Sequence, residues 1–222
     1  MRVQFPFLLM DQSAKFRAIG RSKDAQTSIS GATTVVPSLS ERWSCSVTLL
    51  IKGLHARAQY EAFEACMEGQ LGTTLVPVHA QNRAVDQDGH RVTRCTTADF
   101  GDAETWEHYG FVAAPVATAL VLEAAAVRAT QLRVAFVNST GLRPGQFFSI
   151  GERLHQVQYA WDDAGVQVIQ FHPPLRAAIE VGAVLVLDNP VCVMQMQSEA
   201  EGDYDQLSSI MQSITLNFVE VI

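Results

Sequence analysis

The fold of this chain is decided by residues 43–52, which read WSCSVTLLIK. Large apolar and small polar side chains alternate along this stretch with almost no break. Successive side chains of a β-strand point to opposite faces, so the alternation predicts a strand with one face in a core. The face predicted to be buried consists of Trp43, Cys45, Val47, Leu49 and Ile51.

A helical pattern follows this strand directly. Behind Gly53, residues 54–68 place Ala56, Tyr60, Phe63 and Met67 at helical spacing, with polar side chains around them. This spacing predicts one amphipathic helix over 54–68, followed by a short strand over 75–79. The first domain is therefore expected to be a sheet with one helix.

The residues before Trp43 predict a hairpin and an arm. Apolar side chains alternate along 3–9 and again along 15–18, so we expect two strands paired as a hairpin. Residues 22–40 are polar, contain Gly31, and have few large apolar side chains, which predicts a long exposed loop or arm.

The sequence pattern changes after Pro115, where short apolar segments alternate with turn residues. The predicted strands are 116–123, 131–137, 146–150, 154–159, 166–171 and 183–187. Strands at this spacing are typical of a small barrel or sandwich. Between the last two strands lies 173–176, which reads PPLR, and a turn is predicted at 162–165.

The C-terminal residues 210–222 alternate again, with Ile214, Leu216 and Phe218 on one face. A strand this regular needs a sheet to join, so we expect it to return to the first domain. The predicted fold class is mainly β. Residues 1–115 and 191–222 form a β-sandwich or barrel domain with one helix, and 116–190 form an inserted small β-barrel, OB-like or sandwich.

Composition narrows the function classes. The chain has 222 residues, 48% hydrophobic and 18% charged, which is typical of folded globular proteins. Its net charge of −7, without a basic run, argues against binding to phosphate backbones. The four cysteines are far apart and form no CxxC pair, so neither a zinc knuckle nor a disulfide framework is indicated. No apolar stretch reaches the roughly 20 residues that span a bilayer, so we expect no membrane partner and a product made in the cytoplasm.

No catalytic, cofactor or metal residues are predicted. The densest group of candidate metal ligands lacks a spacing motif and is typical of a solvated loop. It comprises His79, His90, Cys95, Asp99, Asp102, Glu104 and His108. Ser149 has no GxSxG context, and a triad with His155 and Asp162 rests on residue type alone. We therefore expect a protein that is not an enzyme and that has no cofactor.

The aromatic side chains of 116–190 leave one binding role open. They include Phe147, Phe148, Tyr159, Trp161 and Phe171, and small barrels can stack bases or sugars on exposed rings. The module has only five arginines and no lysine, so no specific nucleic-acid binding is expected. The five arginines are Arg128, Arg133, Arg143, Arg153 and Arg176. A module that binds glycan or single-stranded nucleic acid, with Trp161 as the candidate sugar platform, remains the alternative function.

Residues 142–151, which read LRPGQFFSIG, are followed by LHQV at 154–157 and PPLR at 173–176. This order resembles the run L-x-P-G-D, Gly-containing turn, P-P-L-R of distal tail proteins of long-tailed bacteriophages. Residues 43–68 are similar to the strand and helix of the ring-forming domain of that family. Gln146 stands where the family commonly has Asp, and residues 81–110 match no family feature.

The resemblance implies a structural virion protein at the tail tip. Such a subunit forms a homo-hexameric ring that joins the tail tube protein to the tail hub or tip protein, with the tape measure protein as a further partner. The arm 22–40 and the strand 210–222 are the expected contacts between neighbours. A net negative ring is also compatible with a conduit for DNA, because an acidic lumen repels phosphates.

Overall fold

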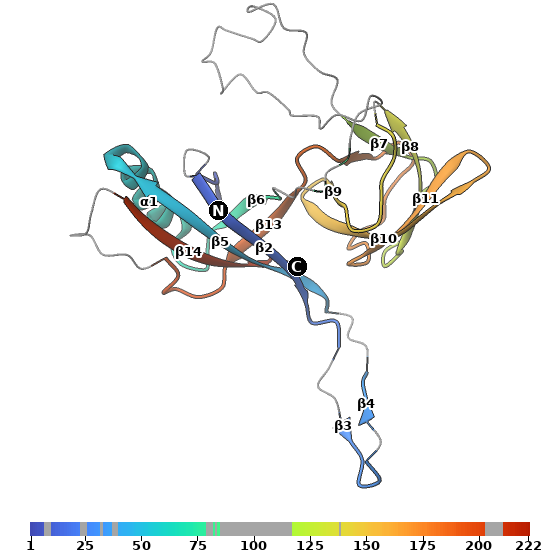
Figure 1. Ribbon diagram of the computed structural model, residues 1–222, viewed down its shortest axis with the longest axis horizontal. Helices are drawn as coiled ribbons and strands as arrows, with labels where there is room; N and C mark the ends of the chain where they lie inside the picture. Colours follow the sequence, from blue (N-terminus) through green and yellow to red (C-terminus); the bar gives the residue numbers. More distant parts are fainter. Residues whose placement is uncertain are drawn as a thin grey trace, which may run out of the picture. The chain divides into compact units, whose positions relative to one another are not determined.

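The computed structural model describes residues 1–6, 10–22, 26–31, 33–36, 40–78, 82, 84, 117–137, 139–202 and 211–222. The protein is mainly β with one described helix, α1 (Gly53–Met67), which confirms the predicted fold class (Figure 1). The chain divides into two compact units. The sheet unit comprises Met1–Val76 and Cys192–Ile222, and the barrel unit comprises Pro77–Val191. The first boundary thus lies at Val76, whereas the sequence placed it after residue 115.

The sheet unit contains a six-stranded sheet in the order β1-β6-β13-β14-β5-β2. The strands are β1 (Arg2–Val3), β2 (Met10–Ile19), β5 (Arg42–Lys52), β6 (Thr73–Pro77), β13 (Val191–Met196) and β14 (Met211–Glu220). The alternation of residues 43–52 is confirmed, because the five apolar side chains predicted to be buried are buried in β5.

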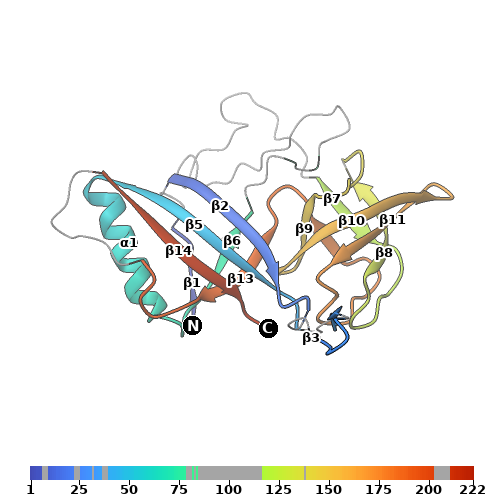
Figure 2. The ribbon, with the colours of Figure 1, turned by 60° about the horizontal axis from the view of Figure 1, so that its bottom comes forward.

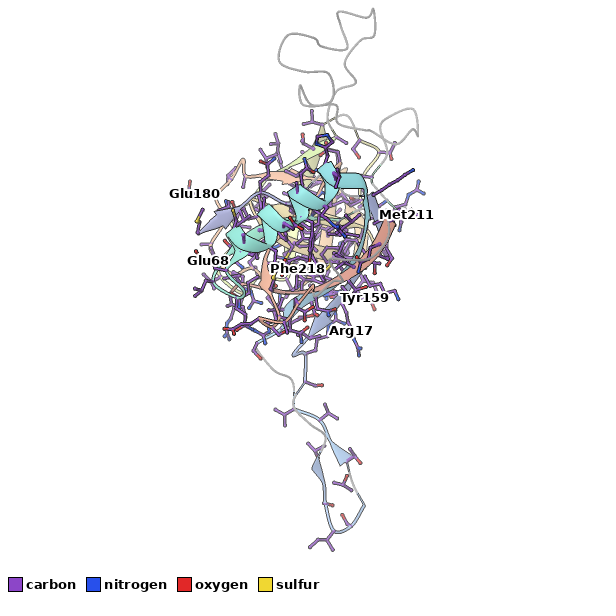
Figure 3. The ribbon with its side chains drawn as sticks, turned by 90° about the vertical axis from the view of Figure 1, so that its left-hand side faces the viewer. Arg17, Glu68, Tyr159, Glu180, Met211 and Phe218 are labelled. Carbon is purple, nitrogen blue, oxygen red and sulfur yellow. The ribbon has the colours of Figure 1, made fainter. Side chains whose placement is uncertain are left out.

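Helix α1 covers one face of this sheet (Figure 2). Its buried side chains are Tyr60, Phe63 and Met67, which are three of the four positions predicted from helical spacing. Phe5 connects the two layers, with ring centroids 6.2 Å from Phe63 and 6.4 Å from Phe218. Figure 3 views this layer from the α1 side, with Phe218 labelled.

The predicted hairpin of the first two strands is wrong. β1 pairs in parallel with β6, and β2 pairs antiparallel with β5, so β1 and β2 form opposite edges of the sheet. The strand predicted over 15–18 lies within β2, whereas of the strand predicted over 3–9 only Val3 is in a strand, residues 4–6 are not, and 7–9 lie outside the described residues. Alternation also does not identify a partner. The partner of β1 lies about seventy residues further along the chain, at Thr73 and Thr74.

Between β2 and β5 lies the arm, a two-stranded ribbon of β3 (Gln26–Thr27) and β4 (Thr33–Thr34) (Figure 1). At its base, Arg21 Nε donates to Glu41 Oε1 at 2.6 Å. All arm residues whose side chains are described are exposed, as the sequence predicts.

The C-terminal strand returns to the sheet unit, which confirms the prediction for residues 210–222. β14 lies between β13 and β5, and Ile214, Leu216 and Phe218 are buried. Near its end, the buried Glu220 accepts a hydrogen bond from the backbone N–H of Trp43 at 3.0 Å.

The barrel unit contains a closed six-stranded barrel in the order β10-β11-β8-β7-β12-β9. Its strands are β7 (Thr118–Val121), β8 (Gln131–Val137), β9 (Phe147–Ile150), β10 (Arg153–Asp163), β11 (Val166–His172) and β12 (Val184–Val186). Each overlaps one of the six strands predicted from the sequence. The barrel is filled by apolar side chains that include Phe148, Ile169 and Phe171.

The β10–β11 hairpin is longer than predicted. β10 continues through Trp161 to Asp163, and the turn is a two-residue loop, Ala164-Gly165, with φ of 56° and 84°. Two positive φ values in succession match the right-handed twist of paired strands. Residues 160–163 are therefore strand rather than turn, and their side chains alternate between the two faces of the barrel wall.

The barrel unit enters and leaves the sheet at adjacent points. β6 and β13 are neighbours in the sheet, and just beyond them the N–H of Val78 donates to the carbonyl of Pro190 at 2.9 Å. We expect that replacing residues 79–189 with Asn-Gly, a dipeptide suited to a two-residue hairpin, leaves the sheet unit folded. Circular dichroism should show the helix signal and a cooperative thermal transition. A product without a transition would contradict this prediction.

Candidate functional site

The best-formed candidate site lies on the outer wall of the barrel. Trp161 of β10 pairs with Val168 of β11, which in turn pairs with Arg133 of β8. The neighbouring row, Ala160, Ile169 and Leu132, packs in the barrel core, so the first row faces outward. Each of these three residues lies next in sequence to a core residue of the same strand, so the alternation of the strand turns its side chain outward.

An ionic bridge crosses this row. Arg133 Nη1 donates to Asp163 Oδ2 at 2.8 Å, and Arg133 Nε lies 3.3 Å from Glu123 Oε1. The two carboxylates remain 53% and 68% exposed, so each ion pair is screened and adds at most about 1 kcal/mol to stability. Because Arg133 connects the segment after β7 with the tip of the β10–β11 hairpin, its main effect is to hold the two carboxylates in place.

These groups line a cavity of about 420 Å³, here called the Trp161 pocket. Its lining includes Glu123, Gln131, Arg133, Trp161, Asp163 and Val168. Val168 is only 7% exposed although it points outward, so its neighbours cover it. Trp161 is 41% exposed. The pocket combines an accessible aromatic face with convergent polar groups, and its volume is within the range of about 300–1,000 Å³ for small-molecule sites.

His155 lies inside the barrel. It is 2% exposed, its ring stacks on Phe148 at 5.4 Å, and it meets Phe171 edge-on at 5.0 Å. Burial is the main cause that lowers the pKa of His155 to about 4, and nearby positive charges, led by Arg176, lower it further. The Nδ1–H group donates to the carbonyl of Pro173 at 2.8 Å, and this hydrogen bond raises the pKa of His155.

The structure does not bring Ser149, His155 and Asp162 together. Ser149 pairs with Leu154, while His155 pairs with Phe148, so Ser149 and His155 point to opposite faces of the barrel wall. Asp162 lies in the β10–β11 hairpin, where its Oδ1 accepts from the N–H of Gly165 at 2.9 Å.

The candidate metal ligands at 79, 90, 95, 99, 102, 104 and 108 all lie outside the described residues. Within the described ranges, no three His, Cys, Asp or Glu side chains are grouped closely enough to hold a metal ion. The described cysteines, Cys45, Cys66 and Cys192, are not in disulfides.

The aromatic side chains of the barrel unit divide between its two faces. Phe148 and Phe171 are buried in the core, whereas Tyr159 is 64% exposed and Trp161 lines the pocket. Sequence reasoning named Trp161 as a candidate platform but missed Glu123, Arg133 and Asp163 as its neighbours. The alternation of Leu132, Arg133 and Val134 was the available signal, because it turns the arginine outward.

The sheet unit contains a second cavity, of about 440 Å³, between β1 and α1. Phe5, Phe63 and Cys66 are among its lining residues, and none of the lining side chains is an acid or a base. Its polar lining side chains are the amides of Gln4 and Gln59, so it has no charged group to recognise a ligand.

No protein-family model matches the chain, and no curated protein matches it in sequence. In the described part of the chain, no helix has the length and apolar character needed to cross a bilayer.

Proposed function

We propose that this protein is a structural subunit of a ring at the distal end of a long-tailed bacteriophage tail. The observation that carries the proposal is the arm, in which the large apolar side chains that the structure describes are exposed. Ile29 is fully exposed, and Val35 and Val36 are 55% and 51% exposed.

An isolated two-stranded ribbon is at best marginally stable in water, so the arm needs a surface to pack on. Fully burying one aliphatic side chain contributes about 1.5–3 kcal/mol, so burial of these side chains would favour a contact between subunits. A neighbouring copy of the chain is the simplest source of that surface. Because the arm and its receiving surface are different, the contact is heterologous and closes into a ring when the rotation allows.

The sheet unit also has two sheet edges, β1 and β2, at which a neighbour can add a strand. Lys15 and Arg17 are exposed on β2 and discourage unspecific pairing at that edge. A specific neighbour would have to match these two positive charges.

The tail setting of the proposal rests on the sequence resemblance. It gives a homo-hexamer at the tail tip of the virion, in contact with the tail tube protein, the hub or tip protein and the tape measure protein. In this proposal the sheet unit forms the ring, and the barrel unit is a peripheral addition without a catalytic role.

The test is the assembly state of the purified full-length chain. Negative-stain images and mass photometry should show uniform closed rings with six-fold symmetry. Ile29→Asp should weaken assembly at least 10-fold, because it places a charge in the proposed apolar contact.

Ser30→Asp is the matched control, since Ser30 is an exposed neighbour in the same turn and introduces the same charge. It should leave the rings largely intact. A persistent monomer across the whole soluble concentration range would sink the proposal. Equal effects of the two variants would show that the arm is not the contact.

A further inference from the structure

We infer that the Trp161 pocket binds a neutral oligosaccharide, with one hexose ring stacked on Trp161. This inference concerns the barrel unit alone and does not depend on ring assembly.

Trp161 supplies a surface suited to the apolar face of a sugar. One face of many hexopyranoses consists mainly of C–H groups, which pack well on a flat aromatic side chain. The backbone of Trp161 is held by the β10–β11 ladder through its pairing with Val168, and the residue lines an open cavity. A platform held by regular strands loses little conformational freedom when a ligand binds.

The polar groups of the pocket suit hydroxyl ligands. The carboxylates of Glu123 and Asp163 are acceptors, and each retains exposed surface beyond its contact with Arg133. A guanidinium has five N–H donors, and the bonds to the two carboxylates leave others of Arg133 available. Sugar hydroxyls both donate and accept, so a hexose on Trp161 can satisfy both kinds of group.

The charge of the pocket disfavours an anionic ligand. Two carboxylates against one guanidinium give the pocket a net charge of about −1, which repels phosphates and acidic sugars. Single-stranded nucleic acid would also need net positive charge along its backbone path, and the charge of Arg133 is already offset by two carboxylates. The same aromatic platform is therefore better matched to a glycan than to a base.

The test uses the full-length chain and four probes: maltohexaose, cellohexaose, N-acetylglucosamine hexamer and a ten-residue thymidine oligonucleotide. Saturation-transfer difference NMR and titration calorimetry should show that at least one neutral sugar binds. Trp161→Ala should weaken that binding at least 10-fold, and Asp163→Asn with Glu123→Gln should weaken it several-fold.

Tyr159→Ala is the matched control, because Tyr159 is an exposed aromatic residue on the same strand but does not line the pocket. It should change the affinity less than two-fold. Thermal melting should show that all variants remain folded. The inference is overturned if none of the three sugars binds, if Trp161→Ala binds as well as the original chain, or if only the oligonucleotide binds.

Discussion

Replacing Gly202 with alanine should destabilise the sheet unit by about 3–5 kcal/mol, the sum of a backbone cost, a steric overlap and a weakened hydrogen bond. Gly202 has a φ of +86°, which is unfavourable for any residue with a Cβ atom. An added Cβ would overlap the Tyr60 hydroxyl and lie 2.6 Å from Leu216 Cδ2. Tyr60 is fully buried and donates to the Gly202 carbonyl at 2.8 Å, so it has little room to move.

Gly53→Ala separates the backbone cost from the overlap. Gly53 lies in the same unit and has a φ of +81°, but an added Cβ would meet nothing within 4 Å. We expect a loss of only about 1–2 kcal/mol, from the backbone cost alone. Amide hydrogen exchange of the sheet-unit strands measures both variants. Similar losses for the two would show that the contact with Tyr60 is unimportant.

His155 should make the stability of the barrel unit depend on pH between about 6.5 and 4. The folded state holds the pKa of His155 at about 4, below the ordinary histidine value of 6.5. Between these values the unfolded chain binds a proton that the folded barrel does not, so stability falls as the pH falls. The full contribution is present above pH 6.5 and decreases by about 3 kcal/mol by the time the pH has passed through 4.

His155→Phe should remove this dependence, whatever its effect on stability at neutral pH. Hydrogen exchange of barrel amides as a function of pH measures the slope. His55→Gln is the control, because His55 is exposed on α1 and belongs to the sheet unit. The interpretation fails if the barrel of the original chain loses no stability relative to His155→Phe between pH 7 and pH 4.

Local pattern predicted the elements of this fold well, because burial of one face imposes a period on the sequence. The strand at residues 43–52, the helix behind it and the six barrel strands all follow from that period. The pairing of β1 with β6 could not be predicted in this way. β1 and β2 are close in sequence, and their patterns give no sign that they lie at opposite edges of the sheet.

The Trp161 pocket was only partly predictable for a similar reason. Trp161 could be singled out as an aromatic near a turn, but its neighbours come from β8 and from the end of β7. Their meeting depends on barrel closure and on the register between β8, β11 and β10. Asp163 was also assigned to a turn, whereas it belongs to the extended hairpin and faces Arg133.

The position of β14 determines the order in which the chain can fold on the ribosome. β14 is synthesised after β5, β13 and the whole barrel unit, yet it lies inside the sheet between β13 and β5. The barrel unit is continuous in sequence and can close as soon as it has emerged. The sheet unit can be completed only after β14 has been synthesised, later than the barrel unit, and until then β5 and β13 lack the strand that joins them. The inserted unit thus folds before the unit that carries it.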